Sequence, residues 1–235
     1  VCSSDLELRG AGDFVEMPPG VLSNLTAATI EMWVNWETFE LPRKRAFNYG
    51  TPWRDVSIAT GEAGELWYVF PEAPQKFHQV ETRALLTTNT WFHIAGTLGP
   101  EGMKLFINGW LIDRDPYTDS FDKTLPEALF RLGETVTTKD AATAFRGWID
   151  EVRIWSKVRT REEVRADMHR KLSGREKDLA GYWNFDDESA RDLGPNGWHG
   201  EFKGKAHAVA KGIPGDIGIQ QSYLDIRVFE AKGAA

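Results

Sequence analysis

Two adjacent acids, Asp150 and Glu151, lie in the stretch GWIDEVRIW and are the first candidates for chemistry. The stretch is typical of a β-strand, in which neighbouring side chains point to opposite faces. Alternation places Asp150 with Val152 and Ile154 on one face and Glu151 on the other. The two carboxylates therefore cannot act on one substrate. Asp150 is expected to be buried, which is costly unless it is hydrogen-bonded or bound to a cation.

Aromatic residues suggest a second kind of chemistry. Ten tryptophans among 235 residues are unusually many. Most would fill the core of a wide β-sandwich, but an exposed ring can stack on the apolar face of a sugar. The stretches NYGTPWRD and DRDPYTDSF combine such rings with polar residues in loop-like surroundings. The predicted ligand-binding residues are Tyr49, Trp53, Arg54, Asp55 and Tyr117, with Trp67, Tyr68 and His78 lining the same side. The alternative, for any single ring, is that it covers the edge of the sandwich.

Catalysis is not predicted. A retaining glycosidase needs two carboxylates about 5–5.5 Å apart across one cleft, and no stretch presents acids at alternating positions on one strand face. No nucleophile-elbow motif is present. His78, His93 and His169 are isolated from one another, and no cluster has the spacing of zinc ligands.

Composition narrows the classes of partner. The net charge is −7 and the basic residues are scattered, so a nucleic acid is not an expected partner. No run of about 18 apolar residues is present, so insertion into a membrane is not expected. Cys2 is the only cysteine, which rules out an intrachain disulfide.

Most of the elements that must position these residues are short strands. Apolar and polar residues alternate in ATIEMWVNW, and Asn108-Gly109 between MKLFI and WLIDR is a strong β-hairpin signal. Many short strands at regular spacing, with almost no helix, predict an all-β fold: a sandwich or jelly roll of two antiparallel sheets.

One helix is expected, in the stretch TREEVRADMHRKL. Thr160 followed by Glu163 forms a capping box at its start. Val164, Met168 and Leu172 recur at helical spacing after it.

Five stretches together resemble a known family. They are LRGAGDFVEMP, TIEMWVN, WFHIAGTLGPEGMKLFINGWLI, FRGWIDEVRIWSKVRTREEV and GYWNFDDESARDLGPNGWHGEF. In this order they resemble the laminin-G-like, concanavalin A-like jelly roll in its bacterial form. The resemblance implies a domain over residues 1–212 and a tail, 213–235, that forms an extra strand or a linker. In that family the WNFDD segment commonly comes first, so residues 179–212 either close this sandwich, which we favour, or belong to a tandem copy.

The resemblance also implies a metal site. IDEVRIW resembles the glucanase-type strand whose aspartate holds a structural calcium together with backbone carbonyls near the chain start. Carried over, Asp150 is a Ca²⁺ ligand, and the Gly10–Asp13 turn, including Asp13, supplies others. The alternative is that Asp150 only accepts backbone N–H bonds.

Fold alone does not fix function, and three functions are compatible with this one. The leading prediction is a non-catalytic carbohydrate-binding or adhesion module that binds a glycan or polysaccharide. By resemblance it would belong to a larger extracellular or cell-surface protein, with neighbouring domains as further partners. The alternatives are a protein-interaction scaffold without a sugar site and, third, a divergent glycoside hydrolase.

Overall fold

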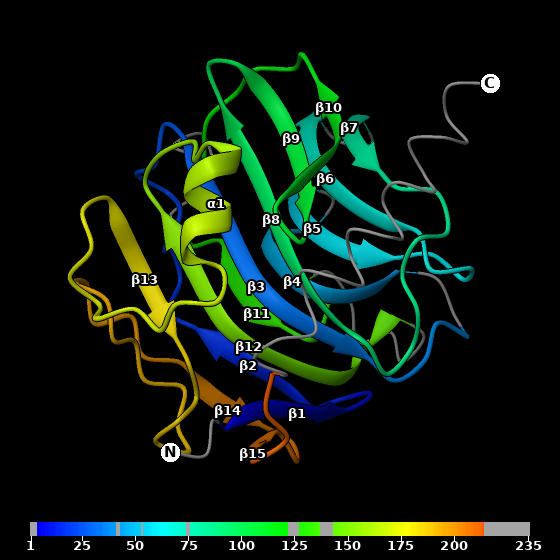
Figure 1. Cartoon of the computed structure of the whole chain (residues 1–235), viewed down its shortest axis with the longest axis vertical. Helices are drawn as coiled ribbons and strands as arrows, with labels where there is room; N and C mark the ends of the chain where they lie inside the picture. The colour runs from blue at the N-terminus through cyan, green and yellow to red at the C-terminus, as the bar shows by residue number, and fades with distance from the viewer. Residues whose placement is uncertain are drawn as a thin grey trace.

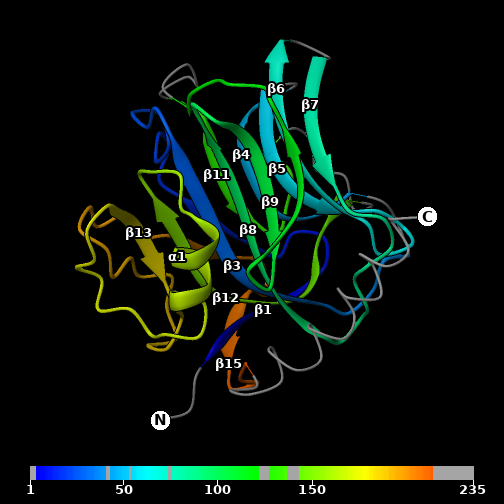
Figure 2. The ribbon, with the colours of Figure 1, turned by 45° about the horizontal axis from the view of Figure 1, so that its top comes forward.

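The computed structural model describes residues 4–40, 43–52, 54–73, 76–121, 127–136 and 143–213. Two antiparallel sheets pack face to face, and one short helix lies outside them (Figures 1 and 2). The all-β jelly-roll prediction is confirmed. In the part of the chain that the structure describes, no helix is long and apolar enough to cross a lipid bilayer.

The large sheet consists of eight strands: β1 (Asp5–Arg9), β3 (Ala28–Trp36), β8 (Trp91–Gly99), β9 (Gly102–Ile107), β10 (Trp110–Asp115), β12 (Arg146–Trp155), β13 (Leu179–Trp183) and β15 (His207–Val209). Their order across the sheet is β10-β9-β8-β3-β12-β1-β15, and β13 also pairs with β12. Thus β1 and β13 follow one another along the edge of β12 that faces away from β3.

The small sheet consists of seven strands: β2 (Phe14–Met17), β4 (Lys44–Thr51), β5 (Arg54–Thr60), β6 (Leu66–Ala73), β7 (Lys76–Glu81), β11 (Leu129–Leu132) and β14 (Glu201–Lys203). Their order is β14-β2-β11-β4-β5-β6-β7. Because β13 and β15 join the large sheet and β14 joins the small one, residues 179–209 complete the sheets of this same sandwich.

Alternate residues of both sheets fill one continuous core, as the period-2 pattern predicts. Tyr49 belongs to this core. Its side chain is fully buried, and its ring lies 6.4 Å from the ring of Phe130. The prediction that Tyr49 contacts a ligand is therefore wrong, because the alternation of β4 turns this residue inward and leaves its neighbour Asn48 on the outer face.

The β9–β10 hairpin forms as predicted. Asn108 and Gly109 both have positive φ, 50° and 72°, as a type I′ turn requires. Asn108 also fixes the hairpin to β8, because its Oδ1 accepts from the N–H of His93 at 2.8 Å and its N–H donates to the carbonyl of His93 at 2.8 Å.

The helix α1 (Arg161–Asp167) starts as predicted and ends early. Thr160 and Glu163 make both hydrogen bonds of the capping box. The helix stops at Asp167 because the following carbonyls turn toward the large sheet. The carbonyl of Met168 accepts from the Trp33 indole at 2.7 Å, so the predicted continuation beyond it does not form.

A β-bulge interrupts the alternation of β12. Asp150 pairs with Trp33, and Arg153 pairs with Glu31, so β12 has one residue more than β3 between these pairs. Glu151, inside the bulge, has a φ of 51°. A bulge of this kind redirects the side chains that follow it.

The bulge changes the face on which Asp150 lies. Ile149 points into the core before it, and Val152 and Ile154 point into the core after it. Asp150 lies on the outer face of the large sheet. The prediction that Asp150 shares a face with Val152 and Ile154 is therefore wrong, although its burial is as expected, at 1% exposure.

The outer face of the large sheet carries a buried ion pair beneath α1. Glu31 is fully buried, and Arg159 Nη1 donates to its Oε1 at 2.8 Å. Burial raises the pKa of Glu31, and the charges of Arg159 and Arg153 oppose that rise. Arg159 also stacks 4.0 Å over the ring of Trp155 and donates to the carbonyl of Glu163 on α1. One guanidinium therefore ties the helix to the sheet.

His93 borders this ion pair in its neutral form. Its Nε2 lies 3.7 Å from Glu31 Oε2, and its ring packs edge-on against Trp33. Burial, reinforced by the charge of Arg153, holds the pKa of His93 well below its ordinary value. The charge of Glu31 is thus balanced by arginines rather than by histidine.

We predict that Tyr49→Ala destabilises the protein by about 3–5 kcal/mol, as large aromatic-to-alanine changes in cores do. Phe77→Ala, at a ring that is 44% exposed, should change stability by less than about 0.5 kcal/mol. Urea denaturation of both variants measures this. Equal effects of the two changes would contradict the assignment of Tyr49 to the core.

We further predict that Arg159→Ala costs about 3–5 kcal/mol in urea denaturation, because it leaves the buried Glu31 carboxylate without its main partner. The control is Arg191→Ala. Arg191 is 63% exposed and lies 4.0 Å from Asp187, so its loss should cost at most about 1 kcal/mol. A cost for Arg159→Ala no larger than that of the control would show that the buried pair does not hold α1.

Candidate functional site

An aromatic and polar cluster lies where β6 and β7 project together at one end of the molecule (Figure 2). Its centre is His78, whose ring stacks on the ring of Tyr117 with centroids 3.6 Å apart and planes 7° apart. His78 Nε2 lies 2.8 Å from Glu72, and its Nδ1 lies 3.4 Å from Asp115. Tyr117 O–H donates to Asp119 at 2.6 Å. We call this set, together with Phe77, the β6–β7 cluster.

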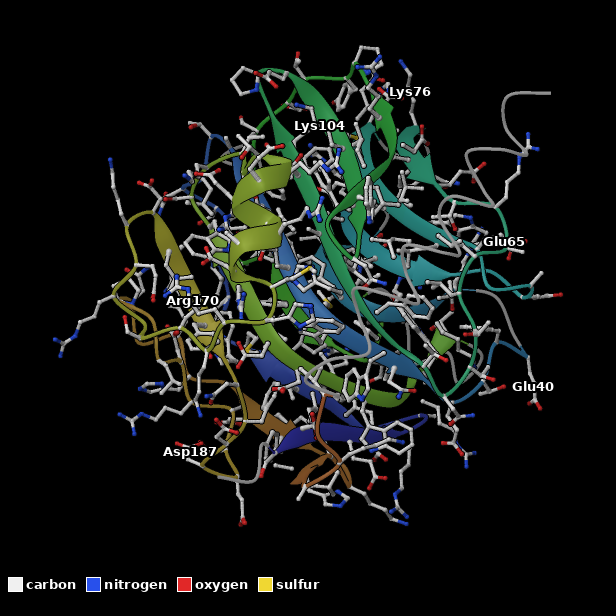
Figure 3. The ribbon with its side chains drawn as sticks, in the orientation of Figure 1. Glu40, Glu65, Lys76, Lys104, Arg170 and Asp187 are labelled. Atoms are coloured by element: carbon white, nitrogen blue, oxygen red, sulfur yellow. The ribbon has the colours of Figure 1, made fainter. Side chains whose placement is uncertain are left out.

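The topology brings these residues together from separate parts of the chain. β7 and β10 are the edge strands of the two sheets and lie beside each other, so the loop after β10 carries Tyr117 to His78 (Figure 1). Lys76, at the start of β7, lies at the same end of the molecule in Figure 3 and pairs with Glu72. His78 pairs with the core residue Phe70 across the strands and faces the seam between the sheets.

Phe77 points the other way. It pairs with Pro71 on the outer face of the small sheet, and its ring is 44% exposed. At this strand end the cluster thus has an exposed apolar ring on the outer face and, on the opposite face, polar groups held by hydrogen bonds. The pKa of Glu72 is lowered by its hydrogen bonds to Lys76 and His78, so this carboxylate is ionised at neutral pH.

The predicted residues Arg54 and Asp55 begin β5 but differ in availability. Arg54 is exposed. Ser57 pairs with Val69, so Arg54, three residues earlier, lies toward the end of the sheet that carries Phe77. Asp55 is buried, where it accepts from Asn48 Nδ2 at 2.6 Å and lies 3.7 Å from Arg45.

Asp55 therefore takes part in a structural network. Asn48 links Asp55 to the loop after β11, because its Oδ1 accepts from the N–H of Val136 at 2.7 Å. A carboxylate bonded in this way is not available to a ligand, and the ligand-contact prediction for Asp55 does not fit its position. Trp53 lies outside the described residues.

The acids of the β6–β7 cluster are not arranged for glycoside hydrolysis. Glu72 and Asp115 both face His78, whose ring fills the space between them. A hydrolase needs that space for the glycosidic oxygen and for water or a nucleophile. The cluster can accept hydrogen bonds from hydroxyl groups but offers no gap for bond cleavage.

Sequence reasoning missed the contributions of Glu72 and Phe77. The signal was present in KFHQVE, where an edge strand exposes alternating polar residues and one phenylalanine. Because single exposed apolar side chains are common on protein surfaces, this signal alone does not identify a binding surface.

A second candidate site lies where β1 meets β12. Leu6 pairs with Ile149, so the next residues outward, Asp5 and Asp150, lie side by side on the outer face. Both carboxyl groups are buried, and Oδ1 of Asp5 has no hydrogen-bond partner among the described residues. Asp5 Oδ2 also accepts from the N–H groups of Gly212 and Lys211 at 2.6 and 3.0 Å.

Both acids are difficult to ionise in this setting. Burial raises the pKa of Asp150 well above its ordinary value, and the charges of Glu151 and Asp5 raise it further. Burial also raises the pKa of Asp5, against the two backbone donors. Two adjacent buried carboxyls retain a shared proton unless a cation replaces it.

Asp13 is not part of this arrangement. It lies beyond the other end of β1 and accepts from the backbone of Arg9 at 3.3 Å and of Lys205 at 2.7 Å. Four residues of strand, at about 3.3 Å each, separate Asp5 from Arg9 by roughly 13 Å. The prediction that Asp13 and the Gly10–Asp13 turn share a metal site with Asp150 is therefore wrong. The antiparallel pairing of β1 with β12 places Asp5, and not Asp13, beside Asp150.

A cavity of about 260 Å³ adjoins the acid pair on the outer face. The residues that line it include Trp33, Met168 and His169 as well as the acids Asp150, Glu151 and Asp186. Among the described residues, no group of three or more His, Cys, Asp or Glu side chains is arranged to hold a metal ion. A cation at Asp5 and Asp150 would therefore need backbone carbonyls or water for its remaining ligands.

Three solved structures with the same fold are described as carbohydrate-binding proteins or were solved with a bound sugar. One is a Bacteroides ovatus protein to which carbohydrate binding is provisionally attributed, with a TM-score of 0.65 and 19% identity, covering 90% of this chain and 61% of that one. Another is the CBM40 module of the Ruminococcus gnavus IT-sialidase bound to α2,3 sialyllactose, with a TM-score of 0.58 and 16% identity over 69% of this chain and 94% of that one.

A third is domain 4 of AbnA, an extracellular GH43 arabinanase from Geobacillus stearothermophilus, in complex with arabinotriose. Its TM-score is 0.55 and its identity 24%, covering 69% of this chain and 75% of that one. At these identities the likeness shows the fold alone. This chain spans less than two thirds of the Bacteroides ovatus protein.

Sequence comparison gives the family. A search of curated proteins returned no significant match. A family model described as the concanavalin A-like lectin/glucanases superfamily matches residues 9–165, which is more than half of the chain. With the two antiparallel sheets seen in the structure, this match shows that the chain belongs to the laminin-G-like branch of the concanavalin A-like lectin/glucanase superfamily.

Proposed function

We propose that this domain is a non-catalytic carbohydrate-binding module of a larger extracytoplasmic protein, and that its glycan site is the β6–β7 cluster. The observation that carries the proposal is the exposed ring of Phe77 at the same end of β6 and β7 as polar side chains that are already fixed in position. A pyranose or furanose presents an apolar C–H face and a rim of hydroxyl groups, and this surface is complementary to both.

Each group has a defined task in this proposal. The Phe77 ring stacks on the apolar face of the sugar. Glu72 and Asp115 accept hydrogen bonds from hydroxyl groups, and Arg54 donates to ring or hydroxyl oxygens. Because His78 and Tyr117 hold the acids in place by stacking and hydrogen bonding, little conformational entropy is lost on binding.

The related structures are consistent with this assignment. Sialyllactose and arabinotriose are bound by domains of the same fold. Those ligands belong to those proteins, and the sugar recognised by this chain is to be found by experiment. The ring of His78 between Glu72 and Asp115 argues against hydrolysis at the same place.

We also propose that Asp5 and Asp150 hold a structural Ca²⁺. The support is a pair of buried carboxyl groups that lie side by side on the outer face of the large sheet. A bound Ca²⁺ would displace the shared proton and let both groups ionise. Because Asp5 also holds the backbone of Lys211 and Gly212, the ion would tie both ends of the described chain to β12.

For the glycan site we predict that Phe77→Ala weakens binding about tenfold or more, equivalent to about 1.4 kcal/mol, with an unchanged melting temperature. Arg54→Ala should act in the same direction. A glycan array identifies a neutral ligand, and calorimetry measures its affinity. Leu111→Ala is the matched control, because Leu111 has the same 44% exposure but lies on the large sheet. If Phe77→Ala binds as the wild type does, the site lies elsewhere.

For the cation site we predict that a chelator lowers the melting temperature of the wild type. Calcium bound only to the native state adds about 2.7 kcal/mol of stability at a hundredfold excess over Kd. Asp150→Asn should lose this response to calcium and chelator. Asp13→Asn, which removes a buried acid bonded only to described backbone N–H groups, should destabilise the domain and keep the response. An identical wild-type melting temperature with calcium and with chelator would leave Asp150 as a protonated structural acid.

A further inference from the structure

Trp110, at the tip of the β9–β10 hairpin, is covered by two arginines from α1. The guanidinium carbon of Arg161 lies 4.0 Å from the centroid of the indole, and that of Arg165 lies 5.0 Å from it. Arg161 and Arg165 are four residues apart, so they extend from the same side of α1. Two positive charges are thus held against one ring.

These arginines differ from the others that stack on rings. Arg131, Arg153 and Arg159 also lie over aromatic rings, and each of them forms a salt bridge to a glutamate. Within the described ranges, Arg161 and Arg165 form no salt bridge with any Asp or Glu. Two adjacent like charges without a counter-ion repel each other, and an anion placed between them relieves that repulsion.

The local structure fixes both arginines. The stem of Arg165 crosses Gly109 so closely that a Cβ at this glycine would lie 2.2 Å from Arg165 Cγ. On the other side, Val164 packs with Phe106 and Ala95 and seats α1 on the large sheet. The guanidinium groups are therefore positioned before any ligand arrives, which lowers the entropy cost of binding.

Stacking of Arg161 and Arg165 on the Trp110 ring limits which of their N–H groups can reach a ligand. Arg161 Nε is buried, so the donors that Arg161 can offer are the N–H groups at the end of its guanidinium, and such groups match the oxygens of a carboxylate or a sulfate. We propose that Trp110, Arg161 and Arg165 form a second binding site, which takes the carboxylate or sulfate groups of an acidic glycan.

The charge distribution favours a glycan over a nucleic acid. The chain carries a net charge of −7, and the exposed Glu162 adjoins Arg161. A nucleic acid presents one phosphate charge per nucleotide and needs an extended basic track, whereas two arginines suit single acidic groups spaced along a sugar chain.

This site is independent of the β6–β7 cluster. It lies on the large sheet beside α1, whereas Phe77 lies on the small sheet (Figure 1). The inference goes beyond the proposed function, and either site can exist without the other.

The test compares wild type with R161Q/R165Q, which keeps polar side chains of similar shape and removes both charges. Calorimetry is run with oligogalacturonate as the carboxylate probe, a heparin-derived oligosaccharide as the sulfate probe, a neutral oligosaccharide and single-stranded DNA. R83Q/R175Q is the charge-matched control, because Arg83 and Arg175 are exposed and form no salt bridge to a described residue. R161K/R165K keeps the charge but loses the planar fork.

We expect wild type to bind at least one acidic oligosaccharide, and R161Q/R165Q to bind it about tenfold or more weakly, as loss of a charge-assisted hydrogen bond implies. R161K/R165K should be intermediate, and R83Q/R175Q should bind as wild type does. The melting temperature and neutral-sugar binding of R161Q/R165Q should not change, which separates a binding role from a purely structural one. Phe77→Ala should leave acidic-glycan binding intact.

Three results would overturn the inference: no wild-type binding to either acidic probe, an equal loss in R83Q/R175Q, or DNA bound as tightly as the acidic oligosaccharide. None of these bears on the neutral-glycan site. Conversely, acidic-glycan binding that depends on Arg161 and Arg165 in a protein that binds no neutral sugar would uphold this inference and refute the site at Phe77.

Discussion

The complete burial of Glu31 on the outer face of the large sheet constrains much of the surrounding structure. A carboxylate without access to water needs a cation at close range and further hydrogen bonds to its partners. Arg159 supplies the cation, and the same guanidinium donates to a carbonyl of α1. The helix is therefore fixed where this pair requires it. The length of α1 follows as well. Arg153 donates to the carbonyls of Asp167 and Arg170 at 2.8 and 2.7 Å, and these bonds replace a further turn of the helix.

The bulge in β12 completes this arrangement. Without the extra residue, Arg153 would point into the hydrophobic core and Val152 would point toward α1. With it, Arg153 reaches the buried acid, and Asp150 remains on the same outer face, next to Asp5. Arg170, which lies below α1 in Figure 3, continues the charge network through Asp167 and Glu176. One inserted residue thus places both the ion pair that holds the helix and the acid pair at β1.

The elements that sequence predicts well are those with local signals. Asn108-Gly109 defines its turn because only residues tolerant of positive φ fit it, and the capping box of Thr160 and Glu163 is complete within four residues. The partners of the acids are not local. Asp150 meets Asp5 through the pairing of β1 with β12, two strands far apart in the sequence, so neither composition nor spacing could choose Asp5 over Asp13. The ligand-contact prediction for Tyr49 fails because NYGTP looks like a loop in sequence, whereas its first residues belong to β4 and Tyr49 faces the core.

Buried and partly buried arginines divide the outer face of the large sheet into two regions with different capacities. Beneath α1, each guanidinium that stacks on a ring is already neutralised by a glutamate, so its attraction is satisfied within the fold. At the tip of the β9–β10 hairpin, Arg161 and Arg165 of α1 stack on Trp110 without a salt bridge to any described acid. Stacking restricts a guanidinium to one plane in both regions. At Trp110 the two guanidinium groups have no salt bridge within the described part of the chain. The same stacking therefore stabilises the fold in one region and, in the proposed second site, prepares a surface for an anion in the other.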